Sequence, residues 1–100
     1  MTNYLLVYRG GGMAETEAAR EASMAAWGRW FEELGAAVVD HGNPVGRTEV
    51  VATSGTTAGT VTGYSVIAAD SFDDAVKLAG GCPILPDGGS VEVAETFAIM

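Results

Sequence analysis

Two strand–helix–strand patterns follow one another along the chain, and this doubling restricts the fold more than any other feature. The first pattern leads from a short apolar run at residues 4–8, through a helix-forming region, to a second apolar run at 36–40. The second leads from residues 64–69, through a capped helix, to an alternating segment at 90–97. Two such units predict the α+β class: a ferredoxin-like split βαβ with an antiparallel sheet and two helices on one face.

Residues from about 14 to 34 predict the first helix, because Ala, Glu, Met and Arg dominate there. Its apolar side chains recur at spacings of three and four, and form one stripe: Met24, Trp27, Phe31 and Leu34. Trp30 is expected at the edge of this stripe. Gly35 stands where a left-handed residue commonly ends a helix.

The second helix has clear start and stop signals. Ser71 is predicted to cap it by accepting from the backbone N–H of Asp74, and residues 80–81 (Gly-Gly) are predicted to end it. In the last strand, residues 90–97, Val91, Val93 and Phe97 are expected on the packed face. Residues 47–62 fit either an irregular hairpin, with 49–52 as one arm, or a loop.

The length and composition of the chain indicate its number of domains and its oligomeric state. The chain has 100 residues, so we expect one domain over residues 1–100, and 48% of the residues are apolar. Residues 4–8 are apolar or aromatic on both faces of the predicted strand, which is typical of a strand covered on both sides. Because both helices occupy one face of the sheet, we predict that a second copy covers the other, giving a homodimeric α+β barrel.

The charge and the cysteine content exclude several classes of partner. Thirteen acidic and five basic side chains give a formal net charge of −8, which repels nucleic-acid phosphates and anionic membranes. Cys82 is the single cysteine, so neither an intrachain disulfide nor a cysteine-based metal cluster is expected. We expect no cofactor. The start of the chain resembles no secretory signal and no apolar run is long enough to span a bilayer, which predicts a cytoplasmic protein.

The residues that suggest chemistry are few. His41, the only histidine, follows the second predicted strand and is a candidate general base, the alternative being an exposed histidine in a turn. Asp40 is its neighbour in sequence, but adjacent residues of a strand point to opposite faces, so Asp40 is not expected to orient it. Arg9, at the end of the first strand, is a candidate for binding an anionic group. Trp27, Arg9 and His41 are the candidate ligand-binding residues.

Other features are interpreted as structural. The glycines at 10–12 follow a strand and precede a helix, but no Lys-Ser/Thr or G-x-G-x-x-G pattern accompanies them, so a flexible turn is favoured. Asp70, Asp73 and Asp74 lie within one turn and diverge, so no metal site is predicted. Cys82 is expected to be a small buried apolar residue.

Taken in order, five segments resemble the YCII-related family and its DGPF-like branch: YLLVYRG, WGRWFEELG, HGNP, GYSVIAADS and CPILPDGGSVEV. The resemblance spans nearly the whole chain outside residues 48–62, and it implies a dimeric α+β barrel. Most of the family has no assigned reaction. A helix histidine that some members carry corresponds to a position near Met24 here, and the D-G-P-F segment is missing, so neither implies a catalytic residue in this chain.

Three hypotheses about function follow. The first is a small-molecule-binding homodimer whose cleft lies between sheet and helices. The second is a cofactor-independent enzyme, similar to isomerases or oxygenases of this fold, with His41 as the acid–base group. The third is a protein-interaction or regulatory module that acts through its acidic surface.

Overall fold

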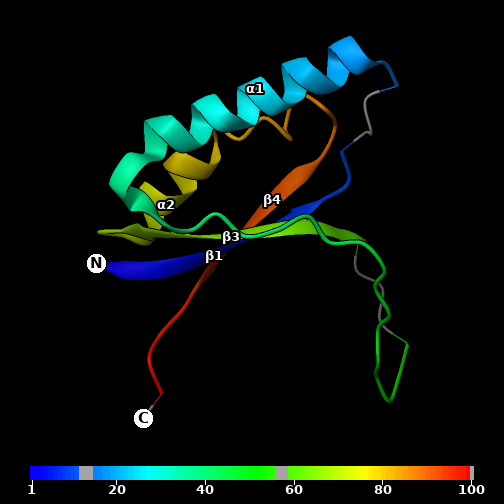
Figure 1. Ribbon diagram of the computed structural model, residues 1–100. Coiled ribbons are helices and arrows are strands. Elements are labelled where there is room, and N and C mark those ends of the chain that lie inside the picture. The colour runs from blue at the N-terminus through cyan, green and yellow to red at the C-terminus, as the bar shows by residue number, and fades with distance from the viewer. Residues whose placement is uncertain (12–14, 56–58, 100) are drawn as a thin grey trace.

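The computed structural model describes residues 1–11, 15–55 and 59–99. Its elements in chain order are β1 (Thr2–Arg9), α1 (Glu17–Leu34), a 3-10 turn η1 (Gly35–Ala37), β2 (Val38–Asp40), β3 (Val61–Ala69), α2 (Phe72–Ala79) and β4 (Ser90–Glu95). The strands form one sheet in the order β2-β3-β1-β4 with antiparallel neighbours, and both helices cover the same face (Figure 1). The predicted ferredoxin-like α+β fold is confirmed.

Alternation along the two central strands divides the sheet into two unlike faces. Tyr4, Leu6 and Tyr8 of β1 are buried beneath the helices. On β3, Ser65, Ile67 and Ala69 point the same way and are also buried. The residues between them face the other side of the sheet and are only half-buried in the single chain. The helices therefore cover one face of the sheet, and within residues 1–11, 15–55 and 59–99 no helix covers the other.

The first helix begins and ends with defined caps. The Thr16 side chain accepts a hydrogen bond from the backbone N–H of Ala19 at 3.1 Å, and Gly35 adopts a φ of 55° just after the last helical residue. The helix begins at Glu17; the expected start near Ala14 falls outside the described residues. Gly35 therefore ends the helix as predicted.

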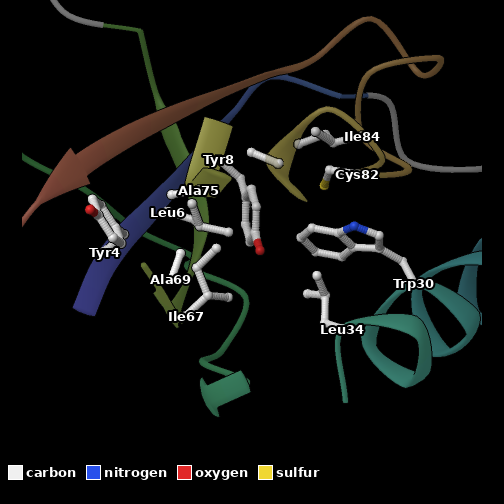
Figure 2. Packing of buried hydrophobic residues seen from close by; sticks show 11 residues of the cluster. Tyr4, Leu6, Tyr8, Trp30, Leu34, Ile67, Ala69, Ala75, Cys82 and Ile84 are labelled. Carbon is white, nitrogen blue, oxygen red and sulfur yellow. The ribbon is translucent and has the colours of Figure 1, made fainter. Parts of the chain in front are cut away.

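The buried side of α1 differs from the predicted stripe. Trp30, expected at the edge, is 4% exposed, whereas Met24, expected inside, is 75% exposed. The Trp30 indole N–H donates to the carbonyl of Leu78 at the end of α2, 3.2 Å away, and its ring packs over Gly81. The contact with α2 rotates the helix so that Trp30 and Leu34 point inward (Figure 2).

The second helix follows its sequence signals. Ser71 Oγ accepts from the Asp74 N–H at 3.1 Å, and the helix ends at Ala79, directly before the two glycines. Its buried side is contributed by two small residues, Ala75 and Ala79, which let the helix lie close to the sheet. The capping role predicted for Ser71 is confirmed.

Two predicted strand boundaries are wrong. Residues 35–37 form a 3-10 turn, so β2 begins only at Val38. The last strand ends at Glu95, and Phe97 beyond it is 80% exposed rather than packed. Residues 47–62 were predicted as either a hairpin or a loop; among the described ones, regular strand begins only at Val61, so they form a loop and the hairpin arm at 49–52 is absent.

The core lies between the sheet and the helices (Figure 2). Its side chains come from both central strands, both helices and the turn after α2. Cys82 in that turn is buried as predicted, and burial raises the pKa of its thiol to about 11. Among the described residues, no cluster of acidic, histidine and cysteine side chains suits a metal ion, and no helix is both long and apolar enough to cross a membrane.

Candidate functional site

A cleft opens between α1 and the sheet, next to the core. Its volume is about 340 Å³. Its walls come from β1, α1, the start of β3, the chain that follows β2 and the turn after α2. The lining residues are Tyr8, Trp27, Phe31, His41, Gly42, Asn43, Pro44, Thr62, Gly63, Tyr64, Ser65 and Ile84. The cleft thus lies on the helix-covered face of the sheet.

Four rings follow one another around this cleft. Tyr8 and Trp27 meet edge to face, with ring centroids 5.1 Å apart and an interplanar angle of 77°. Trp27 and Phe31, one helical turn apart, have centroids separated by 6.0 Å. Phe31 then meets the His41 imidazole at 4.9 Å. Such edge and tilted contacts are favourable for aromatic rings, and together they give the cleft a continuous aromatic wall.

The deep end of the cleft holds a short chain of hydrogen bonds. The Tyr8 hydroxyl donates to Ser65 Oγ at 2.8 Å, and Ser65 Oγ donates to the backbone carbonyl of His41 at 2.6 Å. Burial raises the pKa of Tyr8 to about 12, although the hydrogen bond with Ser65 acts in the opposite direction. Tyr8 is therefore a neutral phenol near neutral pH, held in place by β3.

An irregularity in the sheet brings His41 to the cleft. Val38 pairs with Ile67, but Asp40 pairs with Val66, so two steps along β2 match one step along β3. This β-bulge reverses the alternation. His41, which strict alternation would place on the uncovered face, therefore lies on the helix side beside Phe31.

Gly42 lets the chain after β2 run closely along β3. It has a φ of 76°, and a Cβ atom there would lie 1.7 Å from the Tyr64 carbonyl oxygen. The Gly42 backbone N–H donates a hydrogen bond to the Asp40 carboxylate at 2.9 Å. Beyond it, Asn43 accepts from the Tyr64 N–H at 3.3 Å, and Val45 donates to Thr62 at 2.9 Å. The cleft wall from His41 to Val45 is thus fixed to the sheet.

The structure brings together two of the three predicted ligand-binding residues. Trp27 and His41 both line the cleft. Arg9 lies on the uncovered face, since it follows Tyr8 in the strand; there it forms an ion pair with Glu92 and donates from Nε to the Gly59 carbonyl at 3.2 Å. Asp40 is engaged with Gly42, which agrees with the expectation that it does not orient the imidazole.

Sequence reasoning missed several residues of the site. Tyr8 was assigned to the first strand without a role, and Phe31 only to the apolar stripe. The spacing of four between Trp27 and Phe31 was a usable signal, because it places both rings on one side of α1. No pattern in the sequence indicates a role for Ser65, because its hydrogen-bond partners, Tyr8 and the His41 carbonyl, are distant along the chain.

The electrostatics of the cleft are simple. Among the described residues that line it, none is Asp, Glu, Lys or Arg, and His41 is the only titratable side chain besides the tyrosines. The whole chain carries a formal net charge of −8. The described lining therefore offers aromatic surface and hydrogen-bonding groups, with no lysine or arginine to attract an anion.

Comparisons with known proteins define the fold class. No family model matches the chain, and no curated protein matches it. Among solved structures, it is similar to 5-chloro-2-hydroxyhydroquinone dehydrochlorinase from Burkholderia phenoliruptrix in complex with 2,5-dihydroxybenzoquinone, with a TM-score of 0.57. The two share 20% sequence identity, over 96% of this chain and 95% of that one. At this identity the similarity establishes the shared α+β fold.

Proposed function

We propose that the cleft binds a small, planar, uncharged molecule. The observation that carries this proposal is the continuous wall formed by Tyr8, Trp27, Phe31 and His41 around a cavity of about 340 Å³. Ligand sites are commonly mainly apolar clefts of about 300–1,000 Å³ with a few fixed polar groups. The absence of charged side chains from the described lining favours a neutral ligand.

A pair of matched substitutions tests this proposal. The chain is titrated with small aromatic compounds while backbone and indole N–H signals are followed by NMR. We expect shifts at Trp27, Gly63 and Ser65, and a loss of affinity of about tenfold or more in Phe31→Ala, because part of the aromatic wall is removed. Phe97→Ala, the same change at a residue 80% exposed outside the cleft, is the control. Binding that ignores Phe31 contradicts the proposal.

We further propose that the protein is a homodimer. The uncovered face of the sheet carries half-buried apolar side chains, namely Leu5, Val7, Val66, Ala68 and Ala94. Burial of this face against a second copy would remove it from water. Sedimentation of the 10.2 kDa chain is expected to show a dimer that Val66→Lys dissociates and the exposed-loop control Val50→Lys does not. A wild-type monomer at micromolar concentration contradicts it.

Membership in the YCII-related family and its DGPF-like branch belongs to this proposal, supported by the sequence segments quoted above and by the α+β fold. An alignment of homologues that lacks those segments would argue against it. A cytoplasmic location is likewise proposed from the sequence, and fractionation of cells that express the protein tests it.

A second candidate function is an enzyme that uses His41 as its acid–base group. The observation that favours it is the position of the imidazole, in the cleft lining and against Phe31. The solved structure of similar fold is a dehydrochlorinase, so 5-chloro-2-hydroxyhydroquinone is a suitable first substrate. Catalysis predicts chloride release that His41→Gln abolishes while ligand binding persists. Equal rates in the two proteins would rule out this role of His41.

A further inference from the structure

The deep end of the cleft carries two hydroxyl groups, and both are buried. Ser65 has no exposed surface and Tyr8 is 5% exposed, yet both contribute to the lining of the cavity. Because Ser65 has no exposed surface, a ligand in the cleft can reach only the Tyr8 hydroxyl. Whether the Tyr8 hydroxyl donates to a ligand or accepts from it depends on where the hydrogens of Tyr8 and Ser65 point.

The direction of both hydrogen bonds is fixed by the last acceptor in the chain. The backbone carbonyl of His41 has no hydrogen to give, so Ser65 must donate its single hydrogen to it at 2.6 Å. Ser65 then has none left for Tyr8, so the bond of 2.8 Å between them uses the hydrogen of Tyr8. Each hydroxyl has only one hydrogen, and both hydrogens are engaged within the protein. Towards the cleft, the Tyr8 oxygen therefore presents lone pairs alone.

Two further observations agree with this assignment. Burial raises the pKa of Tyr8 to about 12, so its hydroxyl keeps its hydrogen near neutral pH. Thr62, which also borders the cleft, directs its own hydroxyl towards the carbonyls of Tyr8 and Gly10, at 3.3 and 3.2 Å. The hydrogens of Tyr8, Ser65 and Thr62 are therefore all engaged within the protein. The fourth hydroxyl of the lining, that of Tyr64, accepts from the Asn43 side-chain amide at 3.3 Å.

We propose that the cleft selects neutral aromatic molecules that carry a hydroxyl group, and that this hydroxyl donates to the Tyr8 oxygen. An aromatic ligand that carries only an acceptor, such as an aryl ether, places the lone pairs of its oxygen against those of the Tyr8 oxygen. This inference rests on the proposed function, because it specifies which planar ligands the cleft prefers. The aromatic wall holds the ring, and the Tyr8 oxygen, whose hydrogen is engaged by Ser65, selects the polar group.

The size of the preference follows from the energy of one hydrogen bond. A neutral intramolecular or ligand hydrogen bond contributes a net effect that corresponds to about three- to tenfold in affinity. An acceptor-only ligand forgoes this bond and also leaves a desolvated lone pair without a partner. We therefore expect a hydroxyl-bearing ring to bind at least about threefold more tightly than its methyl ether.

The test compares 2-naphthol with 2-methoxynaphthalene on the wild-type protein, with dissociation constants taken from the NMR shifts of Gly63 and Ser65. Tighter binding of 2-naphthol by about threefold or more supports the inference. Equal binding, or tighter binding of the ether, overturns it and leaves the proposed aromatic site standing. If neither compound shifts these signals, both the inference and the proposed function fail.

A variant separates hydrogen bonding from the greater bulk of the ether. In Ser65→Ala the Tyr8 hydrogen loses its partner and becomes free to donate to a ligand, so the ratio of the two dissociation constants should fall towards one. Ser90→Ala, the same change at an exposed residue of β4, should retain the wild-type ratio. A ratio unchanged in Ser65→Ala would trace the preference to bulk and overturn the inference. The wild-type comparison decides the question even if Ser65→Ala does not fold.

Discussion

Gly42 is the position at which a single methyl group should do most damage to the cleft. Its φ of 76° is a conformation that costs other residues about 1–2 kcal/mol. In addition, a Cβ atom would lie 1.7 Å from the Tyr64 carbonyl oxygen, which is backbone and has no rotamer to change. In Gly42→Ala the segment that carries His41 must therefore move away from β3.

The loss can be worked out from the contacts that this movement breaks. Two hydrogen bonds hold the segment at this point, from the Tyr64 N–H to Asn43 and from Ser65 to His41. At about 1 kcal/mol each, they add about 2 kcal/mol to the backbone term. We therefore expect Gly42→Ala to lower the free energy of unfolding by about 3–4 kcal/mol.

Two other glycines supply matched controls. Gly88 has a φ of 86° but open space around its Cα, so Gly88→Ala should lose only the backbone term of about 1–2 kcal/mol. Gly28 lies inside α1 with open space and no positive φ, so Gly28→Ala should gain about 0.5–1 kcal/mol. Urea denaturation, followed by circular dichroism at one protein concentration, measures all three. If Gly42→Ala is no less stable than Gly88→Ala, the reasoning from the steric contact is refuted.

Three further predictions concern the core, alkaline pH and the uncovered face. In the same urea assay, Trp30→Ala should lower the free energy of unfolding by about 3–5 kcal/mol, and Met24→Ala by less than about 0.5 kcal/mol. A larger loss in Met24→Ala than in Trp30→Ala would contradict the packing of α1. Burial raises the pKa of Cys82 to about 11 and that of Tyr8 to about 12, above their ordinary values of 9.0 and 10.0. The free energy of unfolding should therefore stay constant below pH 9 and fall as the pH rises from 9 to 12, by about 1.4 kcal/mol per pH unit for each group that titrates. A constant free energy of unfolding over pH 9–11 would exclude these shifts. Arg9→Met should leave the dissociation constant of 2-naphthol unchanged, because Arg9 lies on the opposite face of the sheet; a clear loss of affinity would place it in the site.

The parts of the fold that the sequence predicted well are those set by neighbouring residues. Ser71 caps α2 because its hydroxyl reaches an N–H three residues along the same chain. Gly35 ends α1 for an equally local reason. Such interactions need no knowledge of the rest of the molecule, so they can be predicted from a short segment.

The buried side of α1 could not be predicted in this way. Met24 and Trp30 both lie close to one apolar stripe, and spacing alone does not distinguish them. The choice is made by α2, whose last turn offers the Leu78 carbonyl to the Trp30 indole. That contact joins residues 48 positions apart, and nothing near Trp30 in the sequence indicates it.

The candidate site was only partly predictable for a similar reason. Strand alternation was enough to place Tyr8 and Arg9 on opposite faces, and Tyr8 beneath the helices would then have been expected. His41 was different, because regular alternation puts it on the wrong face. Only the bulge between β2 and β3 turns it into the cleft, and a bulge is a property of two paired strands.

The two halves of the cleft come from different layers of the protein. Trp27 and Phe31 belong to α1, whereas Tyr8 and Ser65 belong to paired strands of the sheet. A substitution in the helix therefore alters the width of the space for a ring and leaves the buried hydroxyls in place. A substitution at Ser65 alters the polar group that is recognised and leaves the four rings of the aromatic wall in place. Ligand size and ligand polarity can thus change in separate mutational steps, each without disturbing the other.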